Sequence, residues 1–545
     1  MRKIQIYGPI ALLTLVLCVT AAHAQTFNVL YNFGTNNGDP YKPQWAGIVA
    51  QGPDGNLYST SLGGINSIGA MFKITPSGTL TVPYNFDLTD EDAYSGLTLG
   101  TDGNFYGATA GGGTAGYGTI YQITPSGTLT VLHSFAGTDG YSPFAPPVEG
   151  TDGNFYGTTQ QGGANTFGVV YKITPLGAFT LLHSFDGTDG SYAIAPLVQG
   201  NDGNFYGTTV SGGSSAAYGV VFKITSSGQL TVIYNFDGTH GGEPYGPLVQ
   251  GSDGNFYGTT LVGGSIGYGE VFKITAAGKL TVLHNLNGNT DGDQPFGGLV
   301  QATDGNFYGT TEVGGAGYGT IFQVNPTPPY PYKVVYNFDG STAANPLVTL
   351  TQHTNGILYG DTLDGGTGNV GCALGLCGTF YGLNAGLKPF TSLLPYSGKV
   401  AKTIEFLGQG FTGTTAVSFN GTAATFSVKS DTYLTATVPS GATTGSVKVT
   451  TPSGKLTSNK KFRVTPQLLS FIPPSGPVGT QVTITGVSLT QTLGVGFGDR
   501  VPASFTVNSD TQVTATVPTG AKTGPVGIET QGGTAISSAI FTVTQ

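Results

Sequence analysis

The sequence predicts an all-β protein in which a ring of seven four-stranded units precedes two β-sandwiches. Three observations support this prediction. A hexapeptide motif recurs through residues 25–387 at intervals of 48 to 51 residues, and a different period of 78–79 residues begins near Lys388. The chain has 90 glycines and 11% aromatic residues but only 9% charged residues, a composition typical of short strands joined by tight turns.

The first period is marked by the sequence DGNFYG. It starts at Asp102, Asp152, Asp202, Asp253 and Asp304, with the variants DGNLYS at Asp54 and NGILYG at Asn355. A fixed period near 50 residues indicates a repeat architecture in which each unit is one supersecondary element. We interpret the recurring Asp-Gly-Asn as a tight hairpin turn, because these residues hydrogen-bond locally and tolerate positive φ.

Each repeat contains four predicted strands, which we call A to D. In the fourth repeat they are residues 195–199 (APLVQ), 204–208 (NFYGT), 220–225 (VVFKIT) and 230–236 (LTVIYNF). All four have ordinary strand lengths and are bounded by turn residues. Four antiparallel strands repeated radially about seven times describe a β-propeller, and a parallel β-helix is the alternative.

The ends of the repeat region predict how the ring closes. Residues 27–33 (FNVLYNF) match strand D but precede the first complete repeat, whereas the seventh repeat has no strand D of its own. If residues 27–33 complete the seventh unit, no sheet edge is left exposed there. An open β-helix offers no reason for this offset. We therefore predict a closed seven-bladed propeller over residues 25–387.

The C-terminal third consists of two related units. LPYSG at residues 394–398 corresponds to IPPSG at residues 472–476. Both units are rich in threonine and valine, have glycine and proline at turns, and are long enough for a small β-sandwich. We predict immunoglobulin-like β-sandwich domains at residues 388–465 and 466–545.

Both regions resemble known families. The repeat, exemplified by LVQGSDGNFYGTT at residues 248–260, resembles the GloVer tandem repeat of exported bacterial choice-of-anchor proteins over about residues 26–387. FIPPSGPVGTQVTITG at residues 471–486 resembles the start of an IPT/TIG domain, which has an immunoglobulin-like fold, and residues 388–465 resemble it less closely. The resemblances imply a secreted or surface protein of unknown activity, whose IPT/TIG domains are spacers or adhesion modules.

The N-terminus predicts export. Arg2 and Lys3 precede an apolar run at residues 10–19, and Ala22-His23-Ala24 is a small-x-small cleavage site. The apolar run is too short for a good transmembrane anchor. We predict a signal peptide over residues 1–24, cleaved after Ala24, and a secreted or cell-surface protein with no membrane span after cleavage.

The cysteines and the net charge indicate the redox environment of the protein and exclude some classes of partner. In an exported chain, Cys372 and Cys377 of GCALGLCG predict a disulfide that closes a short loop. The net charge is −9 and we find no cluster of basic residues, so nucleic acids and anionic membranes are not expected partners. The sequence predicts no particular oligomeric state.

The predicted ring has two different faces. Turns A–B and C–D, which are short and nearly identical between copies, share one face. Turns B–C and D–A, which differ between copies, share the other, and we call this the variable face. Because differences between repeats collect on the binding face of repeat proteins, we predict that a ligand binds on the variable face.

One set of candidate residues on the variable face is a column at the start of strand A. Its members are Trp45, Tyr94, Phe144, Ile194, Tyr245, Phe296 and Ala344. We predict that the five aromatic members, Trp45, Tyr94, Phe144, Tyr245 and Phe296, bind the ligand. Aromatic rings can stack on sugar rings or apolar groups; the alternative is that these rings pack between blades.

A second set on this face is acidic. The candidate metal ligands are Asp87, Asp90, Asp186, Asp189, Asp291 and Asp293. Closely spaced carboxylates in glycine-rich loops could bind calcium, which prefers oxygen ligands, and solvated turn acids are the alternative. We predict no other cofactor.

Together these patterns predict an exported, non-enzymatic binding or adhesion protein. One face of the propeller would bind a glycan or another extracellular or cell-surface component, such as a surface protein, and the sandwiches would be spacers. The alternative is a carbohydrate-active enzyme, a lyase or glycosidase, at the mouth of the channel. Glycosidases need two carboxyl groups about 5–10 Å apart. With seven glutamates in the chain and no acid that stands out from the repeat pattern, we predict no catalytic residue.

Overall fold

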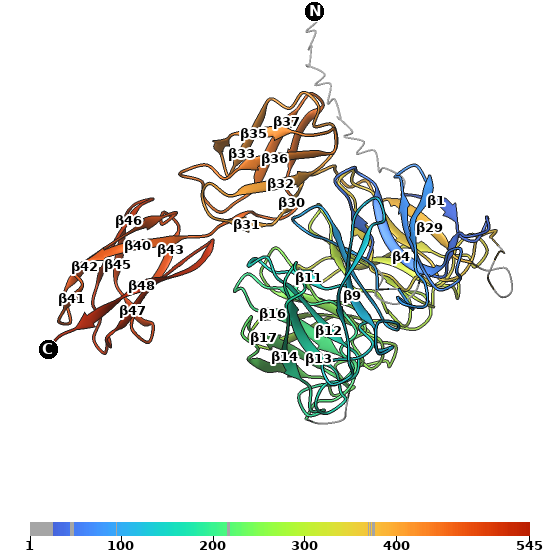
Figure 1. Cartoon of the computed structure of the whole chain (residues 1–545), viewed down its shortest axis with the longest axis horizontal. Helices are drawn as coiled ribbons and strands as arrows, with labels where there is room; N and C mark the ends of the chain where they lie inside the picture. Colours follow the sequence, from blue (N-terminus) through green and yellow to red (C-terminus); the bar gives the residue numbers. More distant parts are fainter. Residues whose placement is uncertain are drawn as a thin grey trace, which may run out of the picture.

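The computed structural model describes residues 25–43, 48–93, 95–214, 218–368, 370, 372 and 377–545. All regular structure in these residues is β-strand, and none of them belongs to a helix long and apolar enough to cross a membrane. They form seven four-stranded blades followed by two β-sandwiches, which confirms the predicted fold class (Figure 1). The predicted signal peptide, residues 1–24, lies outside the described residues.

Each blade runs antiparallel from an inner strand A to an outer strand D. The A strands are β3 (Ala50–Gln51), β7 (Thr98–Leu99), β11 (Val148–Glu149), β15 (Val198–Gln199), β19 (Val249–Gln250), β23 (Val300–Gln301) and β27 (Thr351–Gln352). The B strands are β4 (Leu57–Gly63), β8 (Phe105–Thr109), β12 (Phe155–Thr159), β16 (Phe205–Thr209), β20 (Phe256–Thr260), β24 (Phe307–Thr311) and β28 (Leu358–Asp361).

The two outer strands of each blade follow the same order. The C strands are β5 (Ala70–Ile74), β9 (Thr119–Ile123), β13 (Val169–Ile173), β17 (Val220–Ile224), β21 (Glu270–Ile274), β25 (Thr320–Val324) and β29 (Thr379–Asn384). The D strands are β6 (Leu80–Asn85), β10 (Leu129–Ser134), β14 (Phe179–Ser184), β18 (Leu230–Asn235), β22 (Leu280–Asn285), β26 (Tyr332–Asn337) and β1 (Thr26–Asn32). Blade 1 has an extra strand, β2 (Pro40–Tyr41), which pairs with β4.

The N-terminal strand closes the ring. β1 pairs antiparallel with β29, from Thr26 opposite Asn384 to Asn32 opposite Thr379, and so becomes the outer strand of blade 7. The ring of Phe27 stacks on Tyr336 of blade 6 at a centroid distance of 3.9 Å. The predicted closure is therefore confirmed.

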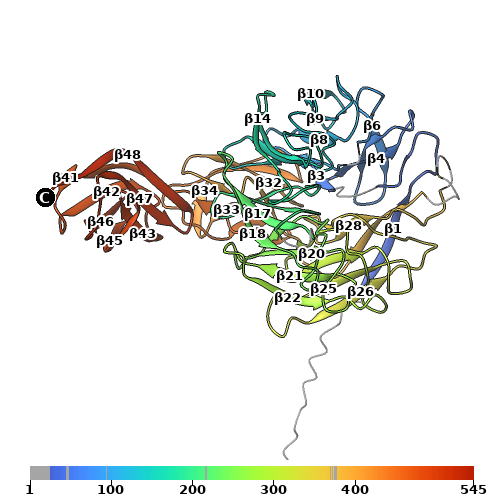
Figure 2. The same cartoon turned by 90° about the horizontal axis from the view of Figure 1, so that it is seen from below.

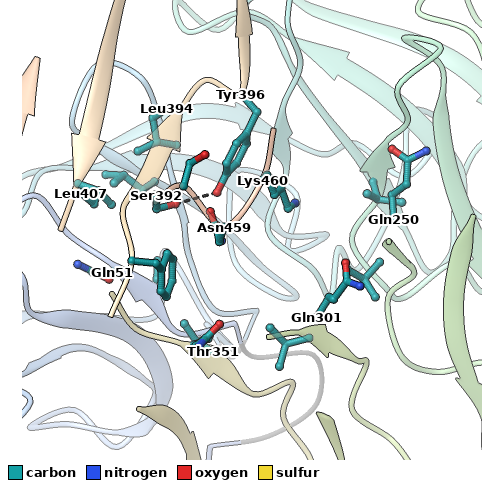
Figure 3. Close-up of a pocket in the computed structure, with 18 of the residues that line it drawn as sticks. Gln51, Gln250, Gln301, Thr351, Ser392, Leu394, Tyr396, Leu407, Asn459 and Lys460 are labelled. Carbon is teal, nitrogen blue, oxygen red and sulfur yellow. Dashed lines mark hydrogen bonds between the residues drawn. The ribbon is translucent and has the colours of Figure 1, made fainter. Parts of the chain in front are cut away.

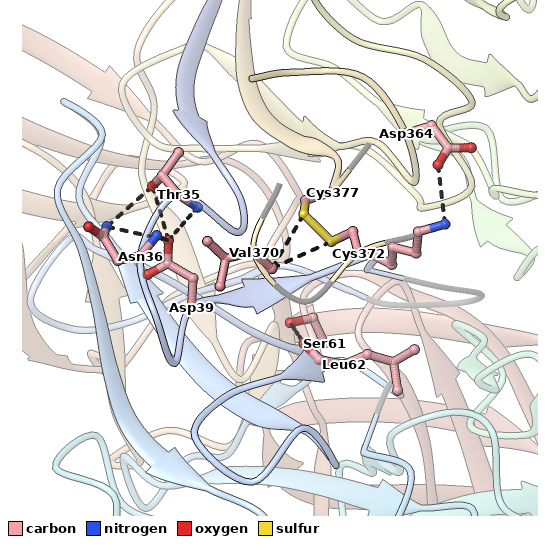
Figure 4. Close-up of a disulfide and its surroundings, with 10 residues drawn as sticks. Thr35, Asn36, Asp39, Ser61, Leu62, Asp364, Val370, Cys372 and Cys377 are labelled. Atoms are coloured by element: carbon pink, nitrogen blue, oxygen red, sulfur yellow. Dashed lines mark hydrogen bonds and ion pairs between the residues drawn. A yellow bond between two sulfur atoms is a disulfide. The ribbon is translucent and has the colours of Figure 1, made fainter. Parts of the chain in front are cut away.

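A disulfide packs against this closing strand (Figure 4). It joins Cys372 and Cys377, whose Cα atoms are 5.5 Å apart. The N–H of Val370 donates to the carbonyl of Gly34, just after β1, at 2.9 Å. Gly34 has a φ of +65°, and a Cβ there would overlap the Sγ of Cys377, so the position requires glycine.

The repeated hexapeptide supplies the packing between blades. The ring of Tyr106 in blade 2 stacks on Phe155 in blade 3 at a centroid distance of 3.7 Å, and the next three junctions repeat this pair at 3.9 to 4.0 Å. The hydroxyl of Tyr106 donates to Asp102 Oδ2 at 2.9 Å, and Asn104 Nδ2 donates to the same oxygen at 2.8 Å. Gly103 has a φ of +80°. The Asp-Gly-Asn turn therefore has a structural role, as predicted.

The first sandwich packs two sheets over a core that includes Phe406, Phe419 and Phe462. Its strands are β30 (Ser392–Leu394), β31 (Ser397–Gly398), β32 (Thr403–Leu407), β33 (Ala416–Phe419), β34 (Thr422–Ala424), β35 (Phe426–Val428), β36 (Tyr433–Thr437), β37 (Val447–Thr451), β38 (Gly454–Thr457) and β39 (Arg463–Val464). One sheet has the order β30-β32-β36-β35 and the other β34-β33-β37-β38.

The second sandwich repeats this plan around Phe497 and Phe541. Its strands are β40 (Gln467–Ile472), β41 (Ser475–Gly476), β42 (Gln481–Val487), β43 (Thr492–Phe497), β44 (Val501–Ala503), β45 (Phe505–Ser509), β46 (Gln512–Thr516), β47 (Gly524–Thr530) and β48 (Gly533–Val543). Figures 1 and 2 show the first sandwich lying against the propeller and the second extending beyond it.

Candidate functional site

A cavity lies where the first sandwich covers one mouth of the propeller channel (Figure 3). Its volume is about 910 Å³. The A strands of all seven blades line its floor where they enter the A–B turns, and the sandwich contributes a roof from residues 388–397, Leu407 and residues 457–463. The cavity is therefore on the face of the short turns, opposite the variable face on which we predicted ligand binding.

The floor of the cavity is a ring of amide side chains. The last residue of strand A is a glutamine in five blades and a glutamate in blade 3: Gln51, Glu149, Gln199, Gln250, Gln301 and Gln352. Each accepts a hydrogen bond from a backbone N–H in the A–B turn of the preceding blade, at 2.7 to 3.1 Å. Gln51 accepts from Thr354 and so joins blade 1 to blade 7. The side chains thus bridge six blade junctions.

The seventh junction is built differently. Blade 2 has Leu99 where the other blades have Gln or Glu, and blade 1 has Pro53, which has no N–H, at the donor position. Leu99 is instead part of an apolar cluster that also includes Leu407 of the first sandwich and has Tyr433 packed against it. The hydroxyl of Thr432 donates to the carbonyl of Pro53 at 2.7 Å. The departure from the repeat is the place where the first sandwich docks.

Hydrogen bonds from other blades hold the roof in place. Arg463 Nη1 donates to the carbonyl of Asn201 in blade 4. Gln409 Nε2 donates to Thr354 Oγ1 of blade 7 at 3.2 Å, and Phe390 N–H donates to the Thr354 carbonyl at 3.1 Å. Because blades 1, 4 and 7 all contribute, the sandwich is held over the channel from several sides.

An aromatic ring and several polar groups project from the roof. The hydroxyls of Tyr396 and Ser392 hydrogen-bond at 2.7 Å, and the Nζ of Lys460 lies 4.9 Å from the centre of the Tyr396 ring. Figure 3 shows the Tyr396 hydroxyl directed at Ser392 with Lys460 beside them, and Gln250 and Gln301 on another side of the same cavity. The cavity is therefore lined by the aromatic residues Phe390 and Tyr396, amides, hydroxyls and cations, groups that can bind a ligand rich in hydroxyls.

Glu149 is the one acidic residue among the described residues that line the cavity. Its Oε2 accepts the N–H of Thr101 at 2.7 Å and its Oε1 accepts the Thr101 hydroxyl at 2.6 Å. Burial raises the pKa of the Glu149 carboxyl, and these two hydrogen bonds and the charge of Lys402 oppose that shift. Both oxygens are therefore committed to the junction between blades 2 and 3.

Comparison with protein families identifies a family model for the repeat region and another for the C-terminal region. A model of the Gloeobacter/Verrucomicrobia repeat matches residues 16–217, 145–374 and 195–424, which together span more than half of the chain. The chain belongs to the Gloeobacter/Verrucomicrobia repeat family. The IPT/TIG domain model matches residues 389–464 and 466–544, so this member of the family carries two IPT/TIG domains after its repeats. Both predicted resemblances are confirmed. No curated protein sequence matches the chain.

Several solved structures are similar to the chain at low sequence identity. A surface glycan-binding protein of Prevotella bryantii is 20% identical, with a TM-score of 0.22, over 27% of this chain and 38% of that one. A Bacteroides thetaiotaomicron protein of unknown function is 16% identical, with a TM-score of 0.36, over 52% and 72%. A fungal alcohol oxidase is 13% identical, with a TM-score of 0.42, over 94% and 100%. At these TM-scores the similarities carry no argument about function.

The predicted aromatic column lies at the other mouth of the channel. Trp45 and Tyr94 are outside the described residues. Phe144, Tyr245 and Phe296 are half-buried, and the rings of Tyr245 and Phe296 meet edge to face at a centroid distance of 5.0 Å. The structure thus brings two column residues into contact across a blade junction.

The column needs one correction in blade 7. In blade 6, Phe296 follows two residues after Gln294, which has a positive φ, and in blade 7 Asn345 has the same conformation. The equivalent of Phe296 is therefore Leu347. Ala344 instead pairs with Asp364 across the blade, so it is not a column member. Leu347 lies 51 residues after Phe296, the same interval that separates Tyr245 from Phe296, so the repeat period itself identifies the equivalent position.

The predicted calcium ligands lie in the D–A loops, mostly hydrogen-bonded within their own loop. Asp186 Oδ1 accepts the N–H of Thr188 at 2.8 Å, and Asp189 Oδ2 lies 2.7 Å from His183 Nε2. Asp291 pairs with His284 in the same way at 2.7 Å. Hydrogen bonds from Thr89 lower the pKa of Asp87, whereas burial raises the pKa values of Asp90 and Asp293. No group of three or more His, Cys, Asp or Glu in the described part of the chain is placed to hold a metal. Calcium binding stays a prediction.

Sequence reasoning missed the cavity because its roof comes from another domain. The A–B turns look alike in sequence, and we took that uniformity to leave little room for a site. A signal was present in Leu99 and Pro53, which both break the repeat pattern at the same junction. Reading that signal required knowing that the two positions face each other.

Proposed function

We propose that this is an exported, non-enzymatic protein that binds a saccharide in the cavity between its propeller and its first IPT/TIG domain. The observation that supports this most is the pairing of the Tyr396 ring on the roof with the amide ring on the floor. A sugar presents C–H faces that stack on an aromatic ring and hydroxyls that hydrogen-bond to amides.

The size and construction of the cavity favour this role. Its volume of about 910 Å³ is within the roughly 300–1,000 Å³ typical of small-ligand sites. The floor is fixed by hydrogen bonds between blades, and Tyr396 is fixed by Ser392 and by the N–H of Arg463, which donates to its carbonyl at 2.9 Å. A preorganised site loses less conformational entropy on binding.

Binding is favoured over hydrolysis by the acid chemistry of the cavity. Glycoside hydrolysis uses a pair of carboxyl groups about 5–10 Å apart. Among the described lining residues the acid is Glu149, and Thr101 occupies both of its oxygens. A turnover screen against plant and microbial polysaccharides tests this preference, and sustained release of oligosaccharide would establish the enzyme alternative instead.

Export is part of the proposal and has its own test. Residues 1–24 carry the features of a signal peptide, and we propose that the mature protein begins at Gln25 in the secreted or surface fraction. Mass spectrometry of the N-terminal peptide from that fraction identifies the cleavage site. An intact Met1 in cell-associated protein would contradict export.

A glycan array followed by calorimetry tests the binding site. Tyr396→Leu in the mature protein should weaken binding of the best array ligand by about tenfold, because one sugar–aromatic stack is lost. The matched control is Phe296→Leu at the opposite mouth, which should leave affinity unchanged. If Phe296→Leu weakens binding and Tyr396→Leu does not, the ligand binds on the variable face. If no glycan binds the parent, the proposed function is wrong.

A further inference from the structure

Charge is distributed very unevenly between the domains. Residues 388–465 contain eight lysines and one arginine but two acids, Glu405 and Asp431, a formal charge of +7 in a chain of −9. Residues 25–387 contain seven lysines and 24 acids, a formal charge of −17. The basic residues of the chain are thus concentrated in the first IPT/TIG domain.

Within the described part of the chain, none of these basic side chains takes part in an ion pair. The ion pairs between described residues involve Lys42, Lys73, Lys522 and four histidines. All eight lysines of the domain are exposed. Their charges remain available to a ligand.

Three of the nine basic residues line the cavity: Lys388, Lys460 and Arg463. The ring of Tyr396 positions the ammonium of Lys460, and the carbonyl of Asn201 holds the guanidinium of Arg463. The acid that lines the cavity is Glu149, which Thr101 holds at the blade junction. With three cations against this one carboxylate, the described lining of the cavity has a net positive formal charge.

We propose that the cavity selects an acidic saccharide, one that carries carboxylate or sulfate groups. This inference rests on the proposed function and names the class of its ligand. Lys388 and Lys460 supply ammonium donors for the anionic groups. The amides of Gln250 and Gln301 already bridge blades and donate to the carbonyls of Gly254 and Gly305, so they offer their remaining oxygen lone pairs to hydroxyls of the ligand. A partly enclosed site strengthens such charge-assisted hydrogen bonds, because less water competes for them.

Calorimetry with the mature full chain and matched probes tests the proposal. The probes are hexagalacturonate, its neutral methyl ester, a sulfated hexasaccharide and a single-stranded hexanucleotide. At least one acidic saccharide should bind about tenfold or more tightly than the neutral ester. The preference should shrink between about 0.01 M and 0.15 M salt, as the Debye length falls from about 30 to 8 Å. The uronate and sulfate arms decide which anionic group is recognised.

Two double variants separate the cavity from general domain charge. Lys388→Gln with Lys460→Gln should weaken binding of the acidic probes about tenfold more than binding of the neutral ester. Lys448→Gln with Lys455→Gln removes the same charge from the exposed face of β37 and β38, outside the cavity, and should leave both unchanged.

The outcomes distinguish this inference from the proposed function. Equal affinity for neutral and acidic hexasaccharides, insensitive to the Lys388 and Lys460 changes, overturns the acidic preference but keeps saccharide binding. Binding of the hexanucleotide as tightly as any acidic saccharide overturns it in favour of a general polyanion surface. Failure to bind any saccharide removes the proposed function along with it.

Discussion

Residues that depart from the repeat pattern show which hydrogen bonds a buried position provides. At the start of strand C, blades 2, 6 and 7 have Thr119, Thr320 and Thr379, whose hydroxyls pair at 2.8 to 3.0 Å with a threonine that ends strand B or directly follows it. Blade 5 has Glu270, which is fully buried, and neither carboxylate oxygen has a hydrogen-bond partner among the described residues. Burial raises the pKa of Glu270 to about 7.

We expect Glu270→Thr to stabilise the propeller. The folded pKa exceeds the unfolded value of about 4.3, so the contribution of Glu270 to stability is present below that pH and lost as the pH rises through about 7. Replacing it should raise the free energy of unfolding by about 1–3 kcal/mol at pH 8 and by less at pH 5. Urea unfolding at both pH values measures this.

The reverse change is the control for that variant. Thr320→Glu places the same group at the equivalent position of blade 6 and should destabilise the protein most at pH 8. Equal effects of either change at pH 5 and pH 8 would show that ionisation of the buried carboxyl is not the cause.

We expect His353 to make the ring junction sensitive to acid. Its Nε2 donates to the carbonyl of Gly55 at 3.0 Å and its Nδ1 accepts the N–H of Asn355 at 3.1 Å, a pattern that assigns the neutral ring. Burial lowers the pKa of His353. Its contribution is therefore present above the unfolded pKa of about 6.5 and lost as the pH falls through the lower folded value. His353→Gln should flatten this part of the stability–pH curve, whereas His240→Gln, at an exposed histidine, should not.

At the scale of elements, the critical strand is the one supplied from the N-terminus. β1 gives blade 7 its outer strand, and its side chains reach blade 6 through the stack of Phe27 on Tyr336. Other blades obtain their outer strand from the same repeat. Ring closure therefore depends on a segment more than 340 residues away from its partner strand in the sequence.

Deletion of residues 26–34 should expose β29 as an edge strand and promote aggregation. The melting temperature should fall, and light scattering during size-exclusion chromatography should detect oligomers. Reduction of the Cys372–Cys377 disulfide should matter far less, because the closed loop is short and constrains the unfolded chain little. A monomeric deletion variant that melts at the parent temperature would refute the role assigned to β1.

At the scale of the whole molecule, one irregular junction decides where the first sandwich sits. Leu99 and Pro53 do not form the amide bridge that is present at the other six junctions. Leu99 instead belongs to an apolar cluster with Leu407, and the carbonyl of Pro53 accepts a hydrogen bond from Thr432. The same docking creates the cavity. Loss of one blade-to-blade hydrogen bond is thus linked to the assembly of the candidate site.

We expect Leu99→Gln with Pro53→Thr to release the first sandwich. The pair restores the acceptor and donor found at the other junctions, and it removes the apolar contact with the sandwich. The propeller should keep its stability, while X-ray scattering should show a larger radius of gyration and ligand binding should weaken at least tenfold as the roof is lost. Leu99→Ile keeps the apolar surface and should change neither. An unchanged radius in the double variant would mean that Arg463 and the other polar contacts suffice for docking.

Most of the fold could be predicted because the sequence patterns that determine it are local and are repeated along the chain. The Asp-Gly-Asn turn, the alternation within strands and the offset of residues 27–33 each depend on short stretches of chain, and seven copies remove ambiguity. Placement of the site could not be predicted in this way. We ranked the two faces by sequence variation, and the cavity lies on the uniform face, where a separate domain supplies the distinctive groups.

The sequence by itself determined the number of blades, the closing strand, the two C-terminal sandwiches and the charge of each, since these follow from local patterns and composition. Only the tertiary structure decided that Tyr396 and Lys460 line one cavity together with Gln250 and Gln301. The physical reason is that domain docking rests on a few contacts between residues hundreds of positions apart. None of those contacts has a periodicity that a sequence could reveal.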